Sequence, residues 1–280
     1  MPLNVPGLLV PFQLLFKPRI IVPAISVKDI RRLDFQALRD AGYRGAVFDK
    51  DNCLTISHED RLVPELHDAW KECKETFGRD NILIVSNSAG TRRDAGAIQA
   101  ESVSYHLSVP VLRHNTLKPG YPCISSIRKY FSSLPNPVKD DELIIVGDRV
   151  FTDVVMANRM NPKHRLFPSQ SRPQAEAGAR EGPLAIWTTD VWKKESMLMR
   201  WFEKQLVAAV QRWIVKRSDP EREGGVVGLM QRLVKPEPAV KVAEDKSGVQ
   251  YWVTRRLNPF ARAEPPPRKR GRWRRIGVAS

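Results

Sequence analysis

The sequence predicts an α/β fold built on a parallel sheet with helices on both faces, a Rossmann-like arrangement. Two observations carry this prediction. Short apolar runs alternate with longer segments of helical periodicity over the first 190 residues. The runs are apolar throughout, as expected of strands that are buried on both faces. Alternation of this kind produces βα units joined by right-handed crossovers.

Five apolar runs are the predicted strands, at residues 46–48, 82–85, 109–112, 143–146 and 184–188. The predicted helices cover 27–41, 64–77, a segment with Arg92 and Arg93 in its first turns, 124–131 and 152–160. Ser26 and Asp29 resemble a capping box that opens the first helix. The second helix carries one apolar stripe, which we interpret as its core face: Leu66, Trp70, Cys73 and Phe77.

Residues 1–25 form an apolar N-terminal arm that five prolines interrupt, so no continuous helix is expected there. The arm either wraps the core or dips short apolar pieces into a membrane interface. Because the chain has no run of 18 apolar residues, we expect no single helix that spans a bilayer. The three cysteines are odd in number and lack metal-ligand spacing, which indicates a reducing compartment.

The net charge of +15 is concentrated toward the C-terminal end. Residues 191–280 hold 21 Lys and Arg against 9 Asp and Glu, whereas the first 190 hold 25 against 22. Such a segment favours an anionic partner, lipid headgroups or nucleic acid, or it is a solubilising tail. The body of the fold is therefore expected at residues 26–190.

The apolar periodicity of residues 191–217 predicts a basic amphipathic helix. The Pro, Gly and charged residues that dominate 218–280 predict a basic, largely disordered tail. In the helix, apolar side chains recur every three or four residues, with Lys and Arg elsewhere around it. The stripe consists of Leu198, Phe202, Leu206, Val210 and Trp213. It could pack on the chain's own core, on a partner or on lipid.

Polar side chains follow the predicted strands in an informative order. They are Asp49 and Asp51, Ser86 and Asn87, Lys118, and Asp148 and Asp153. Two carboxylates as close as the first pair repel one another unless a cation lies between them or one is protonated. Open α/β sheets bind ligands at the carboxyl ends of their strands, so these residues could converge on one sheet edge. Each alone is more often a cap, a turn or a solvated side chain, and only the joint occurrence points to a site.

In this order the residues resemble the four motifs of the haloacid-dehalogenase-like (HAD) phosphatases, over about residues 40–190. The resemblance implies that Asp49 is the nucleophile, which forms an aspartyl-phosphate, and that Asp51 is the general acid and base. Lys118 would bind the phosphoryl oxygens and offset the carboxylates. Ser86 and Asn87 would bind the phosphoryl oxygens as well.

The same resemblance implies a Mg²⁺ cofactor, since carboxylate and carbonyl oxygens suit this ion. Its ligands would be Asp49, the backbone carbonyl of Asp51, and Asp148, with Asp153 acting through a water or by orienting Asp148. Cys53 departs from the Thr or Val usual in the family, and would be tolerated at a small buried position while adding oxidation sensitivity.

The spacing of the motifs leaves no room for a cap domain over the site. The intervals from residue 49 to 86 and from 86 to 118 each accommodate one βα unit. An open site cannot exclude water by closing a lid, but it admits a phosphate anchored to something large, such as a protein, a nucleic acid or a lipid.

The motif sequences resemble the fungal mitochondrial phosphatidylglycerophosphate phosphatases, to about residue 215. The matching segments are FDKDNCLT from Phe48, LIVSNSAG from Leu83, VPVLRH from Val109, KPG from Lys118 and VGDRVFTD from Val146. The resemblance implies hydrolysis of phosphatidylglycerophosphate to phosphatidylglycerol in cardiolipin synthesis. It also implies a peripheral enzyme at the matrix face of the inner mitochondrial membrane, with no nucleic-acid partner.

Five residues at the rim of the site are candidates for contacting the second phosphate or the glycerol of this lipid: Arg92, Arg93, Arg113, His114 and Arg149. Surface ion pairing is the alternative for each. Two other functions stay open, a polynucleotide or phosphoprotein phosphatase that docks through the tail, and an inactive phosphatase-like scaffold. Homo-oligomerisation also stays open.

Overall fold

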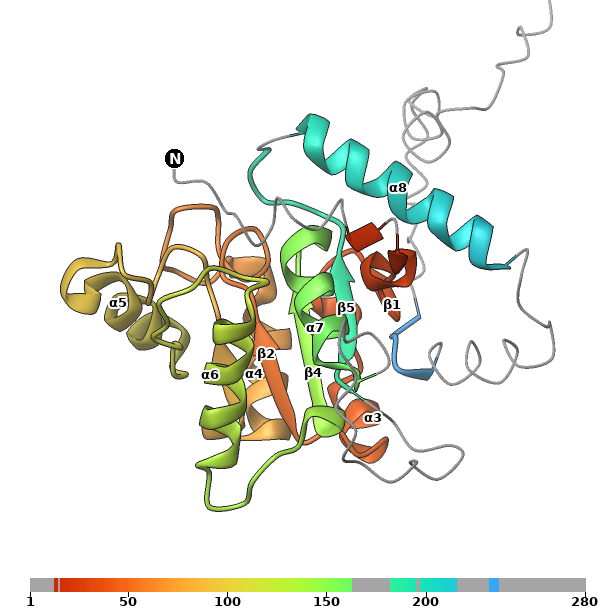
Figure 1. Ribbon diagram of the computed structural model, residues 1–280. Coiled ribbons are helices and arrows are strands. Elements are labelled where there is room, and N and C mark those ends of the chain that lie inside the picture. The colour runs from red at the N-terminus through yellow and green to blue at the C-terminus, as the bar shows by residue number, and fades with distance from the viewer. Residues whose placement is uncertain (1–12, 15, 163–181, 195–196, 216–231, 237–280) are drawn as a thin grey trace, which may run out of the picture. The chain divides into compact units, whose positions relative to one another are not determined.

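The computed structural model describes residues 13–14, 16–162, 182–194, 197–215 and 232–236 of the 280. Its centre is a five-stranded parallel sheet in the order β1-β5-β4-β2-β3 (Figure 1). The strands are β1 (Ile25–Val27), β2 (Gly45–Phe48), β3 (Ile82–Ile84), β4 (Leu143–Gly147) and β5 (Leu184–Thr188). The predicted parallel α/β sheet is therefore confirmed.

Helices cover both faces of the sheet because successive strand residues point to opposite sides. Phe48, Ile84 and Val146 belong to one core, whereas Val47 and Leu83 belong to the other. The helices are α3 (Phe35–Asp40), α4 (His67–Phe77), α5 (Ile98–Leu107), α6 (Tyr121–Ser132), α7 (Val155–Met160) and α8 (Met197–Val215). Buried residues of α3, α4 and α5 join the first core, and those of α6 and α7 the second.

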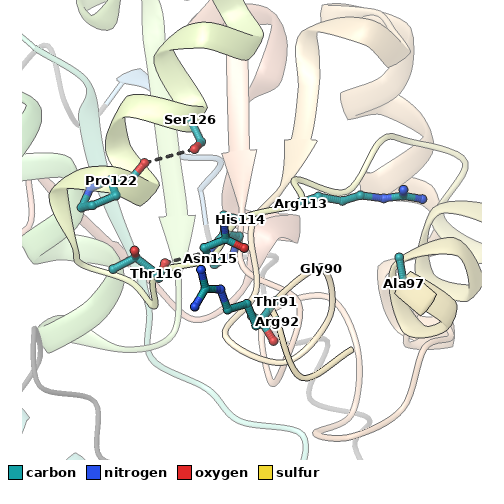
Figure 2. Close-up of a pocket in the computed structure, with 10 residues that line it drawn as sticks. All are labelled: Gly90, Thr91, Arg92, Ala97, Arg113, His114, Asn115, Thr116, Pro122 and Ser126. Atoms are coloured by element: carbon teal, nitrogen blue, oxygen red, sulfur yellow. Dashed lines mark hydrogen bonds between the residues drawn. The ribbon is translucent and has the colours of Figure 1, made fainter. Parts of the chain in front are cut away.

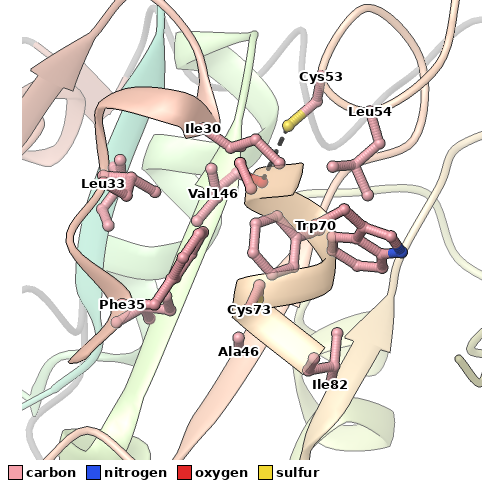
Figure 3. Packing of buried hydrophobic residues seen from close by; sticks show 14 of the residues in the cluster. Ile30, Leu33, Phe35, Ala46, Cys53, Leu54, Trp70, Cys73, Ile82 and Val146 are labelled. Carbon is pink, nitrogen blue, oxygen red and sulfur yellow. Dashed lines mark hydrogen bonds between the residues drawn. The ribbon is translucent and has the colours of Figure 1, made fainter. Parts of the chain in front are cut away.

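The predicted core stripe of the second helix is confirmed on α4. Its four residues, Leu66, Trp70, Cys73 and Phe77, are all buried. Trp70 packs edge-on against Phe48 of β2, with ring centroids 5.2 Å apart, and Figure 3 shows it among the buried side chains of this core. The helix ends at Gly78, whose φ of +84° few other residues adopt.

The predicted first helix is wrong over its first half. Residues Ile25–Val27 form β1, which pairs in parallel with β5, and α3 begins only at Phe35. The helix is capped by Asp34, whose side chain accepts a hydrogen bond from the amide of Ala37. Asp29 accepts from the amide of Arg31 instead of capping a long helix. Pairing with β5 outweighs the local capping signal because it buries the apolar side chains of β1.

The predicted third strand is reduced to a single bridge between Ile84 and Val111. The helix expected from Arg92 and Arg93 starts later, at Ile98, so both arginines lie in turns before it. The loop after β3 passes close to the segment around Leu112, and only a glycine fits at position 90. A Cβ there would lie 2.2 Å from the carbonyl oxygen of Leu112.

Helix α8 forms where the basic amphipathic helix was expected, but only part of the predicted stripe packs on the fold: Leu206 and Val210 are partly buried against the second core. Its buried residues are Arg200, Glu203 and Val207. Leu198 and Phe202, from the predicted apolar stripe, are 86% and 49% exposed. The periodicity alone missed the most buried residues of the helix, because two of them are a cation and an anion. Within the described residues, no helix has the length and apolar character that crossing a membrane requires.

Parts of the predicted arm and tail belong to the fold. Ile20 and Ile21 are buried in the second core, which favours the wrapping interpretation for that part of the arm. Residues 232–236, expected in the disordered tail, include a bridge between Leu33 and Val234 and a buried Leu233. Residues 1–12 and 237–280 lie outside the described part of the chain.

Candidate active site

Three aspartates meet at the carboxyl ends of two neighbouring strands. Asp49 follows β2, while Asp148 and Asp153 follow β4, which pairs directly with β2. All three are buried, and each offers a carboxylate oxygen within 4.8 Å of the others. We call these three residues the acid cluster. The expectation that they converge on one sheet edge agrees with this geometry.

Gly147 at the end of β4 permits the acid cluster to form. A Cβ at this position would lie 2.3 Å from the carboxyl carbon of Asp153, closer than atoms can approach. The chain turns into the π-helical segment Val150–Val154 just beyond, which carries Asp153 back over the strand end. A glycine is therefore required before Asp148.

Lys118 supplies a buried positive charge to the acid cluster. Its Nζ donates to Oδ1 of Asp49 and to Oδ1 of Asp153, both at 2.7 Å. Burial disfavours the charged amine, but Asp153 and Asp49 outweigh it and raise the pKa of Lys118. The backbone amide of Lys118 donates to Oδ1 of Asn87 at 2.7 Å, so the loop after β3 holds the lysine loop in place.

The acid cluster carries more negative charge than Lys118 can offset. Burial raises the pKa of Asp49 well above its usual range, and repulsion from Asp153 and Asp148 adds to this although Lys118 opposes it. Burial, together with Asp153, also raises the pKa of Asp148. Buried carboxylates that repel one another in this way fit a divalent cation with oxygen ligands, which would relieve the repulsion.

Asp51 has different partners from the acid cluster. Its carboxylate accepts from Lys50 Nζ at 2.8 Å, from the His58 amide at 2.9 Å and from Ser88 Oγ at 2.9 Å. Burial raises its pKa, but Lys50 and these hydrogen bonds outweigh burial, so the pKa of Asp51 is lowered. Ser86 Oγ lies 2.9 Å from Ser88 Oγ and 3.5 Å from Asp51. The first two motifs therefore meet.

Lys50 and Ser88 were missed by the sequence analysis. Lys50 is fully buried, and its Nζ also donates to the backbone carbonyl of Glu59 at 2.9 Å. Its position between two aspartates was the available signal, but a lysine next to a strand end is usually solvated.

The rim candidates separate into different environments. Arg92, Arg113 and His114 line a cavity of about 320 Å³ beside the loop after β3 (Figure 2). Arg92 points toward Asn115 in Figure 2, whereas Arg113 points away and pairs with Glu101 at 3.1 Å. Of the remaining two candidates, Arg93 is exposed, and the amide of Arg149 donates to Asp153 Oδ2 at 3.3 Å.

His114 is buried and joins two loops of the site. Its ring nitrogens lie 2.9 Å from the Ser86 carbonyl oxygen and 2.7 Å from that of Thr116. Burial and the charge of Lys118 lower the pKa of His114, and outweigh the two carbonyls, which favour the protonated ring. A neutral ring donates to only one of the two carbonyls.

Helix α8 brings two further residues to Asp148 that the sequence analysis did not assign to the site. Arg200 donates to Oδ2 of Asp148, and both groups are buried. Glu203 is buried one turn further on, and burial raises its pKa to about 7. No sequence signal identified them, because the apolar periodicity of α8 leaves charged residues out of the predicted buried face. Arg200 also lines a second cavity of about 440 Å³, between α8 and the segment after β5.

Comparisons with known proteins agree with this geometry. A family model described as mitochondrial PGP phosphatase matches residues 5–163. The mitochondrial phosphatidylglycerophosphatase of Saccharomyces cerevisiae is 31% identical over 204 residues, which cover 73% of this chain and 97% of the yeast protein. The chloroplastic/mitochondrial phosphatidylglycerophosphate phosphatase 1 of Arabidopsis thaliana is 31% identical over 221 residues, covering 78% of this chain and 56% of the plant protein.

The chloroplastic phosphatidylglycerophosphate phosphatase 1 of Chlamydomonas reinhardtii is 39% identical over 160 residues, covering 57% of this chain and 55% of the algal protein. No solved structure matches the chain. The family model covers more than half of the sequence, and the yeast relative is matched over nearly its whole length. The chain is therefore an enzyme of the phosphatase class and belongs to the mitochondrial phosphatidylglycerophosphate phosphatase family.

Proposed function

We propose that this enzyme is a HAD-type, capless, Mg²⁺-dependent phosphatase that hydrolyses phosphatidylglycerophosphate to phosphatidylglycerol and inorganic phosphate, in cardiolipin synthesis. The observation that carries the proposal is the acid cluster bridged by Lys118, at the strand ends where this chemistry requires it. The names of the relatives supply the substrate class.

Mg²⁺ would be held by Asp49, the backbone carbonyl of Asp51 and Asp148, with Asp153 acting through a water or by orienting Asp148. The donor set is all oxygen, as this ion prefers. Burial raises the pKa values of Asp49 and Asp148, repulsion between the carboxylates raises them further, and a bound cation would oppose both effects. When bound, the ion would keep the carboxylates ionised and neutralise charge on the phosphoryl group.

Asp49 is the nucleophile in this proposal. Lys118 Nζ and the Lys50 amide both donate to its Oδ1, and no described residue donates to its Oδ2. Oδ2 is thus the oxygen we assign to attack. The new bond joins this oxygen to phosphorus, and the bond from phosphorus to the glycerol oxygen breaks.

Asp51 transfers the protons. The leaving alkoxide takes a proton from Asp51, and Asp51 then takes one from the water that hydrolyses the aspartyl-phosphate. In the free enzyme Lys50 favours the ionised form of Asp51, which suits the second step. A phosphate dianion nearby would raise the pKa of Asp51 by like-charge repulsion, which prepares the acid for the first step.

The phosphoryl oxygens would bind Lys118, the hydroxyl of Ser86 and the amide nitrogen of Asn87. The Asn87 carbonyl oxygen already holds the Lys118 amide, so its amide nitrogen remains as the donor. For the second phosphate we assign Arg92 in the cavity of Figure 2 and retain the other four rim residues as candidates: Arg93, Arg113, His114 and Arg149.

Peripheral binding to an anionic membrane, at the matrix face of the inner mitochondrial membrane, completes the proposal. Five exposed apolar residues in the first two turns of α8 support it. The side chains of Met197, Leu198, Met199, Trp201 and Phe202 are each at least 47% exposed, near the exposed cation Lys204. Exposed apolar side chains flanked by positive charge suit the interface of an anionic bilayer.

Phosphate release from phosphatidylglycerophosphate in anionic liposomes tests the proposal. Wild type is expected to release phosphate only with Mg²⁺, and Asp49→Asn is expected to release none above background. Arg92→Gln tests the second-phosphate assignment and should slow hydrolysis of the lipid but not of a small soluble phosphomonoester. An equal loss on both substrates would count against a headgroup role. Faster hydrolysis of polynucleotide or phosphoprotein ends than of the lipid would contradict the substrate assignment.

A further inference from the structure

Helix α8 lies outside the βα units, yet it contacts the segment that follows β4 and carries Asp148 of the acid cluster. We call residues 148–150 the fourth loop. Arg200, only 7% exposed, donates through Nη2 to the carboxylate of Asp148, and its Nη1 lies 3.4 Å from the carbonyl oxygen of the same residue. One guanidinium thus contacts both the side chain and the backbone of Asp148.

Glu203 contacts the same loop one turn further along α8. It is 2% exposed, and its carboxylate accepts a hydrogen bond from the backbone amide of Val150. Its charge also interacts favourably with Arg149. From the other side, Trp187 Nε1 of β5 donates to the Asp148 carbonyl oxygen at 3.0 Å. The fourth loop is therefore held between β5 and α8.

The two cations at the acid cluster divide its carboxylates between them. Lys118 contacts Asp49 and Asp153, whereas Arg200 contacts Asp148. A guanidinium is a planar fork that fixes the orientation of the group it grips, unlike a lysine ammonium. Placing such a fork on Asp148 orients the carboxylate as well as offsetting its charge.

We propose that Arg200 is a positioning residue that orients Asp148 for the divalent cation, while Glu203 holds the following backbone of the fourth loop. This inference rests on the proposed Mg²⁺ site. It makes α8 part of the catalytic structure and not only a surface for membrane contact. Partners of metal ligands typically change metal affinity about 10–100-fold when they are removed.

The test measures Mg²⁺ binding without turnover, as the rise in melting temperature of the full chain during a MgCl₂ titration. Arg200→Lys keeps the charge but loses the fork, and Arg200→Gln loses both. Both variants are expected to need about tenfold or more Mg²⁺ for half of the stabilisation. Arg212→Gln, an exposed arginine on the same helix, is the matched control and should titrate like wild type.

Three outcomes separate the possibilities. Arg200 would be only a counter-charge for Asp148 if Arg200→Lys titrates like wild type and Arg200→Gln binds Mg²⁺ more tightly. That pair of results would overturn the inference. If the Arg200 variants do not fold, Glu203→Ala decides: unchanged Mg²⁺ affinity in that variant refutes the inference, and weakened affinity supports it. Absence of Mg²⁺ stabilisation in wild type itself would instead refute the proposed metal site.

Discussion

Replacing Lys118 by Gln tests whether the acid cluster is as electrostatically crowded as the structure indicates. Lys118 Nζ bonds two buried carboxylates at 2.7 Å each, and it is 1% exposed. Removing one partner of a buried ion pair costs about 3–5 kcal/mol, because the remaining charge stays buried without a partner. Here two carboxylates lose their cation, so we expect a loss at the upper end of that range.

Such a loss is a large fraction of the 5–15 kcal/mol typical of a folded domain, so it is measurable by urea denaturation. In EDTA, Lys118→Gln should show a clearly lower free energy of unfolding than wild type. Saturating Mg²⁺ should restore part of the difference, since the ion would supply the missing positive charge.

Asp49→Asn is the matched variant, because it removes a negative charge from the acid cluster where Lys118→Gln removes a positive one. The raised pKa of Asp49 means that the folded protein disfavours its charge, so neutralising it should cost no stability in EDTA. Both variants should nevertheless be inactive. Equal stability of Lys118→Gln and wild type in EDTA, or a large loss in Asp49→Asn, would refute this electrostatic reasoning.

Three further predictions follow from particular contacts. The pKa of His114 is lowered by folding, so below about pH 6.5 the unfolded chain binds a proton while the folded ring stays neutral. The free energy of unfolding should therefore fall as the pH falls below this value. In urea denaturation, His114→Gln should reduce this pH dependence, and an unchanged slope would count against the reasoning. Gly147→Ala would place its Cβ 2.3 Å from the Asp153 carboxyl carbon, so we expect the free energy of unfolding to fall by about 1–3 kcal/mol. Mg²⁺ should also raise the melting temperature of this variant less than that of wild type. Wild-type behaviour in both assays would show that Asp153 is free to move away. Leu198→Ser combined with Phe202→Ser should reduce sedimentation with anionic liposomes while leaving hydrolysis of a soluble ester intact, and equal sedimentation would argue against docking through α8.

The sequence predicted the sheet well because parallel strands buried on both faces are continuous apolar runs. Residues 46–48 and 143–146 read clearly as strands, and the polar residues after them converge as strand pairing requires. The apolar stripe of α4 was equally readable, since its buried face is entirely apolar. Strands and helices were therefore predictable where their buried faces consist entirely of apolar residues.

The failures have a common physical cause, which is that long-range partners outweighed local signals. Ser26 and Asp29 look like a helix start, but pairing with β5 makes Ile25–Val27 a strand. The buried face of α8 carries Arg200 and Glu203, and their burial is tolerable only because the fourth loop supplies partners. Nothing in the helix's own sequence reveals those partners.

The convergence of the candidate site residues was predictable, but the network of contacts among them was not. The order of Asp49, Lys118, Asp148 and Asp153 in the chain, and its resemblance to known motifs, indicated that these residues could meet. The buried Lys50 beside Asp51, and the bond from Asn87 to the Lys118 backbone, depend on how separate loops meet. The sheet determines where these loops lie, so the sequence of either loop alone does not predict the contacts between them.

The most direct test of the account is to look for the phosphorylated enzyme. Asp51→Asn loses the acid of the first step and the base of the second, so the phosphoryl group of phosphatidylglycerophosphate should transfer slowly. Once on the protein, it should stay there long enough for mass spectrometry after a long incubation. The account predicts one phosphoryl group on the peptide that contains Asp49, dependent on Mg²⁺ and absent when Asp49 is also replaced by Asn. Phosphate release by the Asp49→Asn enzyme at the wild-type rate, or a phosphoryl group on another residue, would contradict it.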